Sequence, residues 1–497
     1  MTEVLTALGH RWESAVATAL EGVRGVVVSR RCADVPELLS VAEAGLGDTA
    51  VVSSDLRGLD LSVVDRLRSH RIRVIGVHPP DDEQSERRLR QLTVSTTLPV
   101  DAGPDRWAAC LDEDPTLDDL EAALAGGVAE PTPDGASGAS GVDAAHQAAV
   151  GAAPSEDDRP GGADGATGWL PSGALPEGNT SSAGASDPRG RSSRQGHGAP
   201  RGPERAPVVA VWGPTGAPGR TVLATTLAAE VASRGVEVLL VDADTYGGCV
   251  AQSLGLLDEA PGIAAATRAA DQGLLDLPML ARVAPEVVPG LRVLTGLPKA
   301  ERWPEVRAAA LERVLDLSRS LVGVVVVDCG FCLEDDEELS YDTSAPRRNE
   351  ATLTSLAASD LVVAVGGADP VALQRFVRGL QELGTVPSGD PVPVVNRIRA
   401  GAVGSRPESR IADSLLRFAG LDSVRFVPDD PATLDAALLA GRSVVEHAPD
   451  SPVRRAVADL ASAVLPWTLP DGDRRHHKDR RAHRRRLSGR AAAAVEA

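Results

Sequence analysis

A glycine-rich segment near the middle of the sequence has the composition of a phosphate-binding loop. Gly213–Thr221 reads GPTGAPGRT, follows the apolar run Val208–Trp212 and precedes a stretch with helical periodicity. Backbone N–H groups and the positive end of the helix dipole at such a helix start bind phosphate. Thr221 stands where a loop hydroxyl ligates Mg²⁺, and Arg220 takes the place of the usual lysine. Because Pro214 and Arg220 break the strict GxxxxGK[ST] pattern, the segment alone is equally compatible with an ordinary glycine turn.

Three aspartates follow two further apolar runs. VLLVDADTYGG contains Asp242 and Asp244, and GVVVVDCG contains Asp328. The carboxyl ends of parallel strands meet at one edge of a sheet, where such folds bind their ligands. Mg²⁺ takes one or two carboxylates, keeps several waters and bridges substrate phosphates. We therefore expect Thr221, Asp242 and Asp328 to form a metal site. Asp244 is expected to orient an attacking water.

The runs that position these residues predict a doubly wound, mostly parallel sheet. Most are continuously apolar, as strands are when helices cover both faces. Strands are expected at Val208–Trp212, Val236–Val241, Leu291–Leu294, Val322–Val327, Leu361–Val365, Val392–Val395 and Ser423–Val427. We place this α/β domain at residues 206–470.

A smaller α/β domain is expected at residues 1–113. Strands are expected at Val4–Leu8, Val26–Val28, Thr49–Val52 and Val74–Val77, with helices at Trp12–Leu20 and Leu61–Leu67. Asp55 follows a strand, as the phosphate-accepting aspartate of a response-regulator receiver does. The acidic residues that a receiver needs after its first strand are missing, since that place reads ALGHRW. We interpret the domain as a pseudo-receiver used for docking or dimerisation.

Two segments differ sharply in composition from these domains. Residues 114–205 are rich in Ala, Gly, Pro and Ser, and they bury too little apolar surface to offset chain entropy, which predicts a disordered linker. Residues 471–497 form an arginine-rich tail without an apolar face. Weak contact of this tail with DNA or an anionic membrane, and a solvated tail without a partner, both stay open.

The charge and the cysteines restrict the class of protein. The chain has 497 residues and a formal net charge of −19, which repels phosphate backbones and excludes a DNA coat protein. No apolar run reaches the ~18 residues of a membrane span. The N-terminus lacks the pattern of a signal peptide, and the 5 cysteines are scattered. We expect a cytoplasmic protein that is either free or peripheral at the membrane or nucleoid.

Several motifs, in order along residues 208–465, resemble the ParA/MinD family of P-loop ATPases, the SIMIBI class with a deviant Walker A loop. Within that family they resemble the CpaE-like branch, which has a receiver-like N-terminal domain. The family loop KGGxGKT is matched here by Thr215–Thr221, TGAPGRT. VDADTYGG resembles the family's switch I, and VVVVDCG resembles its Walker B motif. VPVVNRI places Asn396 where the family reads adenine.

The resemblance implies ATP and Mg²⁺ as cofactors, with catalytic roles for Asp244 and Arg220. The nucleotide-binding residues that it implies are Gly216, Ala217, Pro218, Gly219, Arg220, Thr221, Val222, Asn396 and Arg397. The family's first loop lysine, which reaches the partner's phosphates across a dimer, is Thr215 here. The guanidinium of Arg220 is also bulkier than an ammonium. Both departures indicate that nucleotide binding survives better than turnover.

By this resemblance, the protein is a nucleotide-dependent ATPase switch that positions a cellular assembly. The assemblies that the family suggests are the septum in cell division, the chromosome in partitioning, and the pilus or secretion machinery. The expected partners are ATP and ADP, a second copy in a nucleotide-dependent homodimer, and another protein. The alternative is a non-hydrolysing nucleotide-binding scaffold or regulator with a degenerate P-loop.

Two further features stand close to Asp328. Cys329 and Cys332 have CxxC spacing, and the sequence offers no second Cys or His pair, which favours a thiol pair in a loop over a metal site. The acidic stretch at residues 334–350 is either a solvated loop or a partner-binding switch region.

Overall fold

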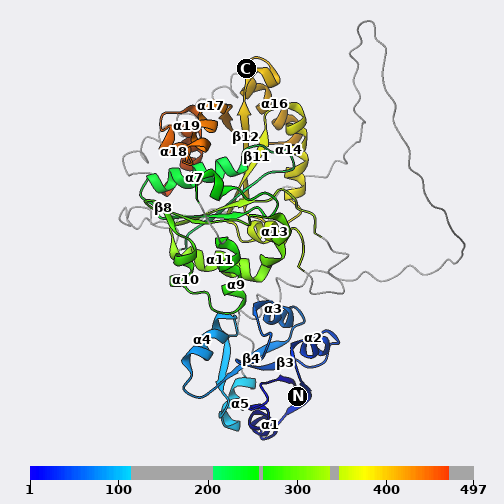
Figure 1. Ribbon diagram of the computed structural model, residues 1–497. Helices are drawn as coiled ribbons and strands as arrows, with labels where there is room; N and C mark the ends of the chain where they lie inside the picture. The colour runs from blue at the N-terminus through cyan, green and yellow to red at the C-terminus, as the bar shows by residue number, and fades with distance from the viewer. Residues whose placement is uncertain (113–204, 257–260, 336–345, 469–497) are drawn as a thin grey trace, which may run out of the picture. The chain divides into compact units, whose positions relative to one another are not determined.

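The computed structural model describes residues 1–112, 205–256, 261–335 and 346–468. Its strands form two sheets, one within residues 1–112 and one within residues 205–468 (Figure 1). Residues 114–204 of the expected linker, the whole basic tail at 471–497 and residues 336–345 of the acidic stretch lie outside the described residues.

The first sheet has five parallel strands in the order β2-β1-β3-β4-β5. Its elements are β1 Thr2–Ala7, α1 Glu13–Glu21, β2 Val26–Cys32, α2 Val35–Glu43, β3 Thr49–Ser53, α3 Leu61–Ser69, β4 Arg73–His78, α4 Glu83–Gln91, β5 Thr96–Pro99 and α5 Pro104–Asp112. This is the strand order of flavodoxin-like doubly wound folds. The four expected strands are confirmed. The fifth, TTLP, was not expected because it has a single apolar side chain between threonines and a proline.

The second sheet has eight strands in the order β13-β12-β11-β6-β10-β7-β9-β8. They are β6 Val208–Trp212, β7 Val238–Ala243, β8 Glu286–Val288, β9 Leu291–Leu294, β10 Val324–Cys329, β11 Leu361–Gly367, β12 Asp390–Ile398 and β13 Arg425–Pro428. All neighbours are parallel except β8 and β9. The expected doubly wound sheet is confirmed. The short edge strand β8 was not expected, because three residues show no periodicity.

Helices cover both faces of this second sheet (Figure 1). They are α7 Arg220–Ser233, α8 Val250–Ser253, α9 Gly262–Asp271, α10 Leu277–Val283, α11 Ala308–Leu321, α13 Glu350–Ala357, α14 Pro370–Leu383, α15 Ala400–Val403, α16 Pro407–Ala419, α17 Pro431–Leu439, α18 Val444–His447 and α19 Pro452–Val464, with 3₁₀ turns η1 Ala300–Glu305 and η2 Pro466–Thr468. Val209 and Val211 of β6 pack with α7 and α19. Val208 and Ala210 pack with α9, α11, α13 and α14 on the other face. Both faces of β6 are therefore buried, which explains its unbroken apolar sequence.

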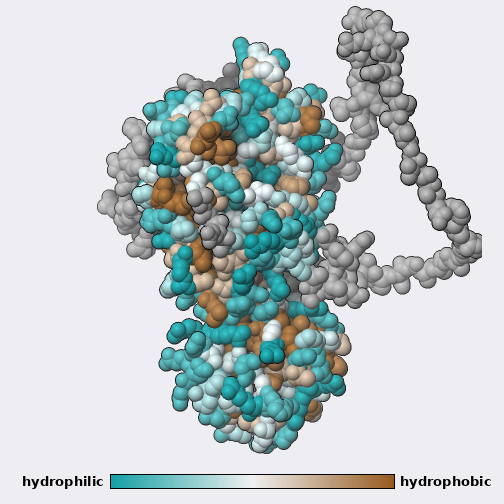
Figure 2. Space-filling model, in the orientation of Figure 1, coloured by the Kyte–Doolittle hydropathy of each residue, from teal (hydrophilic) through white to brown (hydrophobic). Residues whose placement is uncertain are grey.

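The surface is predominantly hydrophilic on the face that Figure 2 shows, with scattered apolar patches. Two of the helices, α14 and α16, carry large apolar side chains that are more than half exposed, namely Val371, Leu416 and Phe418. Among the described residues, no helix combines the length and the apolar character that crossing a bilayer requires.

Candidate functional site

The glycine-rich segment forms the turn between β6 and α7. Gly216 and Gly219 have φ angles of +79° and +85°, in the left-handed region that costs other residues energy. The Ala217 N–H donates to the Pro214 carbonyl over 2.9 Å, which closes the turn. Helix α7 begins directly after Gly219. The chain therefore places a tight loop of small residues at the N-terminus of a 14-residue helix, the geometry that favours an anion.

Thr221 and Asp328 meet beneath this loop, although they are 107 positions apart in sequence. The Thr221 hydroxyl donates to Oδ2 of Asp328 over 2.6 Å. Asp328 is fully buried, and its Oδ1 has no hydrogen-bond partner among the described residues. Burial raises the pKa of Asp328 well above its usual range, and the charge of Asp242 raises it further. This carboxyl therefore has an unsatisfied oxygen, and the charge of Arg220 only partly offsets the effects of burial and of the neighbouring aspartates on its pKa.

Asp242 lies beside Asp328, because the two residues pair in register on the adjacent strands β7 and β10. Its Oδ2 accepts from the Val250 N–H over 3.0 Å, and its Oδ1 accepts from the Asp244 N–H over 3.3 Å. Burial raises its pKa to about 7 against the opposing effect of these backbone hydrogen bonds. Asp242 therefore shapes the loop after β7 with both oxygens and stands next to the expected metal position.

Asp244 and Arg220, the expected catalytic pair, are in contact. Nη2 of Arg220 donates to Oδ2 of Asp244 over 3.3 Å, and Nη1 donates to the Gly213 carbonyl over 3.3 Å. The other carboxylate oxygen of Asp244 accepts from the N–H groups of Tyr246 and Gly247 over 2.9 and 3.1 Å. The side chains of Arg220 and Asp244 are 16% and 8% exposed. The guanidinium thus lies between the loop and the aspartate expected to orient water.

Asn396 lies near the end of β12, against the same loop. Its Nδ2 donates to the Pro218 carbonyl over 3.0 Å, and its Oδ1 accepts from the Arg397 N–H over 2.8 Å. A Cβ atom on Gly219 would stand 2.4 Å from this Nδ2, so the contact requires glycine there. Arg397 is exposed and has a φ angle of +59°. The role of Asn396 and Arg397 at adenine stays a prediction, and the contact of Asn396 is with the loop itself.

One group of residues around the loop after β7 was missed by the sequence reasoning. The Tyr246 hydroxyl donates to Oδ1 of Asn349 over 2.7 Å, and the Asn349 amide donates to the Glu334 carbonyl over 2.7 Å. The Arg348 guanidinium lies 3.6 Å from the Tyr246 ring centroid and donates to the Thr245 hydroxyl over 2.9 Å. These contacts join the loops that follow β7 and β10. The available signal was the position of Tyr246, one of only 2 tyrosines, directly after the aspartate pair.

The described residues contain no group of three or more His, Cys, Asp or Glu side chains arranged to hold a metal ion. Mg²⁺ needs only one or two protein carboxylates when phosphates and water supply the rest of its ligands. Asp328 and the Thr221 hydroxyl are the residues placed to do this. Cys329 is fully buried, and burial raises the pKa of its thiol. Cys332 is partly exposed and is a free thiol.

In the first sheet, Asp55 lies just beyond the end of β3 and is paired with a cation. Nε of Arg11 donates to its Oδ2 over 3.1 Å, and the Trp12 indole N–H donates to the same oxygen over 3.2 Å. The Gly9 N–H donates to the hydroxyl of Ser53 over 2.7 Å. An arginine and an indole therefore contact Asp55 from the loop after β1, where a receiver has acidic residues.

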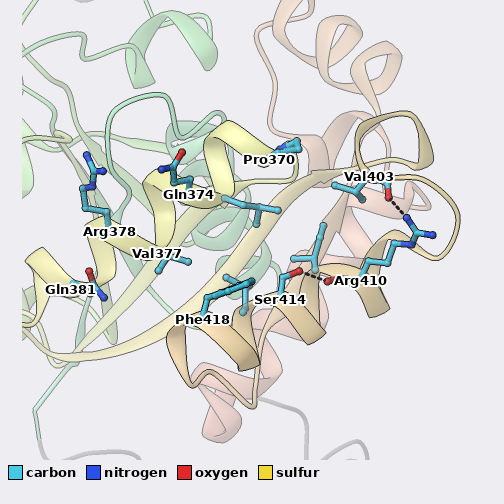
Figure 3. Close-up of a pocket in the computed structure, with 12 residues that line it drawn as sticks. Pro370, Gln374, Val377, Arg378, Gln381, Val403, Arg410, Ser414 and Phe418 are labelled. Atoms are coloured by element: carbon cyan, nitrogen blue, oxygen red, sulfur yellow. Dashed lines mark hydrogen bonds between the residues drawn. The ribbon is translucent and has the colours of Figure 1, made fainter. Parts of the chain in front are cut away.

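Two hollows open on the second α/β unit. One, of about 540 Å³, lies beside the loop and is lined by Pro214, Thr215, Phe331, Cys332, Leu333, Glu334, Arg375, Arg378, Glu382 and Thr385. The other, of about 630 Å³, lies between α14 and α16 (Figure 3). Its apolar lining includes Val377, Leu415 and Phe418. Only the first hollow touches the glycine-rich loop.

The sequence matches no family model and no curated protein. Solved structures match it at low identity. A ParA family ATPase from Chlorobium tepidum is 19% identical with a TM-score of 0.44, over 52% of this chain and 97% of that one. The septum site-determining protein MinD from Pyrococcus horikoshii, complexed with Mg-ADP, is 17% identical with a TM-score of 0.42, over 52% and 96%. A MinC:MinD cell division protein complex from Aquifex aeolicus is 17% identical with a TM-score of 0.41, over 53% of this chain and 98% of that one.

Proposed function

We propose that residues 206–470 form an ATP-binding domain of the ParA/MinD/CpaE type that hydrolyses ATP slowly and acts as a nucleotide-dependent switch. One observation carries this proposal. The Thr221 hydroxyl at the start of α7 contacts the Asp328 carboxyl at the end of β10, directly below a glycine-rich turn. A loop hydroxyl and a strand-end carboxylate are the protein groups that hold Mg²⁺ beside a bound triphosphate. The unpartnered Oδ1 of Asp328 fits a cation, or its water shell, as the missing partner.

The chain supplies the remaining groups of a phosphate site. When bound, Mg²⁺ neutralises charge that develops on the terminal phosphates. The backbone N–H groups of Gly216 and of Gly219 to Val222, together with the dipole of α7, favour phosphate oxygens. Arg220 adds a positive charge at the first residue of α7. A cation beside Asp328 favours its ionised form, which opposes the effect of burial on that carboxyl.

Hydrolysis requires Asp244 to exchange one partner. A water oxygen bonds to the terminal phosphorus while the bond from that phosphorus to the bridging oxygen breaks, giving ADP and phosphate. We assign the orientation of this water to Oδ2 of Asp244. That oxygen accepts a hydrogen bond from Arg220 over 3.3 Å, so the water competes with the guanidinium for it until Arg220 turns to the phosphates. Breaking this pair first is a physical reason for slow turnover.

The same contact favours a second candidate function, a non-hydrolysing scaffold or regulator. The side chains of Arg220 and Asp244 are largely buried, and Asp244 also accepts two backbone N–H groups. If the pair persists when nucleotide binds, Asp244 cannot orient water. The chain would then bind ATP without turning it over.

Binding and single-turnover hydrolysis, measured on the purified full-length chain, separate these functions. Titration calorimetry with ATP is performed in Mg²⁺ and in EDTA, followed by single-turnover assays. We expect Asp244→Ala to keep ATP affinity within about threefold and to lose turnover by about tenfold or more, because we assign its carboxylate to the attacking water rather than to the nucleotide. Arg220→Ala is expected to weaken binding itself. Asp459→Ala is the matched control, because Asp459 is an exposed aspartate on α19.

Each function predicts its own result. Mg²⁺-dependent binding without turnover in the unmodified protein identifies the scaffold. Turnover that Asp244→Ala leaves unchanged removes our assignment of that residue. No ATP binding in Mg²⁺ contradicts both functions.

The cellular role and the domain organisation follow from the sequence resemblance and form part of the proposal. We propose that the switch positions an assembly such as a septum, a chromosome, or a pilus or secretion apparatus, as a cytoplasmic protein that forms a nucleotide-dependent homodimer and binds another protein. Residues 114–205 and 471–497 are proposed as the linker and the basic tail. Localisation of the tagged full-length protein in its own cell, with Asp328→Asn for comparison, tests this role.

We assign residues 1–113 as a pseudo-receiver that does not accept phosphate. Arg11 and Trp12 both donate to Oδ2 of Asp55, which leaves the aspartate in a cationic rather than a Mg²⁺-binding surrounding. Incubation with acetyl phosphate and Mg²⁺ is expected to add no phosphate to Asp55, as measured by intact mass spectrometry. A mass increase that Asp55→Asn abolishes contradicts the assignment.

A further inference from the structure

The hollow of about 540 Å³ beside the glycine-rich loop carries two arginines on one wall. Pro214 and Thr215 of the loop form part of its lining, and Arg375 and Arg378 of α14 form another part. Both arginines are exposed, and neither makes an ion pair or a hydrogen bond to another residue in the described ranges. Within the described ranges, two positive side chains that form no ion pair thus line the hollow next to the loop that we propose binds phosphates, and the carboxylates of Glu334 and Glu382 line it as well.

Arg375 is the arginine that touches the loop. Its Nη1 lies 2.6 Å from the point where a Cβ atom on Gly216 would stand, so the absence of a side chain on Gly216 makes room for the guanidinium. Gly216 is also one of the residues with a left-handed φ angle. The backbone turn favours glycine at this position, and the absence of a side chain also leaves room for the guanidinium of Arg375.

Helix α14 is held rigidly at the position that this contact requires. Asp369 caps its N-terminus by accepting from the Ala372 N–H over 3.0 Å, and Pro370 follows the cap. A Cβ atom on Gly366, at the end of β11, would stand 2.4 Å from Cγ of the fully buried Phe376. The helix therefore packs directly against backbone, and a one-residue shift would remove Arg375 from the loop.

The two sides of α14 differ in chemistry. Figure 3 shows Val377 and Phe418 facing the groove between α14 and α16, while Arg378 points away from that groove. Arg378 nonetheless lines the margin of both hollows. The apolar side chains of α14 thus face α16 and the sheet, and a basic stripe of Arg375 and Arg378 faces the loop.

We propose that Arg375 binds the terminal phosphate of a nucleoside triphosphate held by the 215–221 loop. The inference rests on the proposed nucleotide site and names an additional residue of that site. Thr215 carries no charge, whereas Arg375 is a cation that lies against the loop at Gly216, and Arg378 adds a second charge beside the same hollow. A guanidinium donates two parallel hydrogen bonds to a phosphate, which suits a group that reaches in from another helix.

The test compares a triphosphate with a diphosphate. Calorimetric affinities of the full-length protein for a non-hydrolysable ATP analogue and for ADP, both in Mg²⁺, are measured for the unmodified chain, Arg375→Ala, Arg375→Lys and the double variant with Arg378→Ala. Arg410→Ala is the control, since Arg410 is an arginine on α16 that lines the other hollow. We expect Arg375→Ala to lower the affinity for the ATP analogue by about tenfold to a hundredfold, which corresponds to the loss of one charge-assisted hydrogen bond. ADP affinity is expected to stay within about threefold.

The ratio of the two affinities identifies the role of Arg375. A loss of affinity for the analogue alone in Arg375→Ala, partly restored in Arg375→Lys, supports the proposal. A larger loss of affinity in the double variant adds Arg378 to the site. An equal loss for both nucleotides makes Arg375 a structural support of the loop and overturns the proposal, as does no loss at all. A higher affinity of Arg375→Ala for both nucleotides means that Arg375 blocks the site until nucleotide displaces it, and this result also overturns the proposal. If the unmodified chain binds neither nucleotide, the proposed function fails together with this inference.

Discussion

Replacing Asp328 by asparagine is expected to stabilise the metal-free protein while abolishing Mg²⁺-dependent nucleotide binding. Asp328 is fully buried, and its Oδ1 lacks a partner among the described residues. A buried group left unsatisfied in this way costs about 1–3 kcal/mol. The asparagine carbonyl keeps the hydrogen bond from Thr221, and its amide donates toward the neighbouring carboxylates. At roughly 2–4 °C per kcal/mol for a domain of this size, we expect the unfolding midpoint to rise by about 2–12 °C.

The sign of the pH dependence makes this prediction specific. Burial and the charges of Asp242 and Asp244 raise the pKa of Asp328 in the folded chain well above the ordinary value of an aspartate. The carboxyl therefore makes its full contribution to the free energy of unfolding below about pH 4. As the pH rises from there toward the pKa of the folded chain, the free energy of unfolding falls by about 1.4 kcal/mol per pH unit. Asparagine does not titrate. The advantage of the variant should thus be small near pH 4 and largest near pH 8.

Differential scanning calorimetry of the full-length protein in EDTA, from about pH 4 to pH 8, measures this difference. A second series contains Mg²⁺ and ATP. There the unmodified protein should gain about 3 kcal/mol when free nucleotide is a hundredfold above its dissociation constant, and Asp328→Asn should gain almost nothing. An Asp328→Asn variant that is less stable in EDTA at pH 8, or whose advantage does not depend on pH, refutes the reasoning.

Three further substitutions test other contacts. Glu230→Ala removes a carboxylate that is 2% exposed and pairs with Arg454 and a second arginine. It should lower the free energy of unfolding in urea by about 3–5 kcal/mol, and an unchanged midpoint would disprove this loss. Gly219→Ala forces a side chain into a left-handed turn against Asn396, so calorimetry should show ATP affinity falling by about tenfold or more while circular dichroism stays native; full affinity would count against the loop geometry. Tyr246→Phe loses one hydroxyl hydrogen bond and should lower the unfolding midpoint by roughly 2–4 °C, whereas a higher midpoint would contradict that bond's contribution.

The fold followed from the sequence to a large extent, because the signal was local. Val208–Trp212 and Leu291–Leu294 were expected with the bounds that the structure has, since unbroken apolar runs between polar turns mark strands buried on both faces. The strands missed were β5 and β8. Both are short, and β8 is an edge strand that pairs antiparallel on one side only, so neither needs a continuous apolar sequence.

The candidate site was predictable where it depends on strand ends. Asp242 and Asp328 follow apolar runs, and parallel pairing in register brings them side by side. What could not be predicted is which oxygens are already engaged. Asp242 uses both oxygens to hold the following loop, whereas Asp328 keeps one free of any partner in the described chain. That difference depends on the path of the loop after β7, which no spacing of residues specifies.

The sequence by itself determined most of the parallel strands of the two sheets, the glycine-rich turn before α7 and the aspartates at the ends of their strands, because each depends on residues close together in the chain. Only the tertiary structure decided that Asn396 holds Pro218, that Arg220 pairs with Asp244, and that Arg375 lies against Gly216. The physical reason is that these contacts depend on how helices pack on the sheet. Packing is fixed by the shape of many buried side chains together, such as Phe376 against Gly366, rather than by any local pattern.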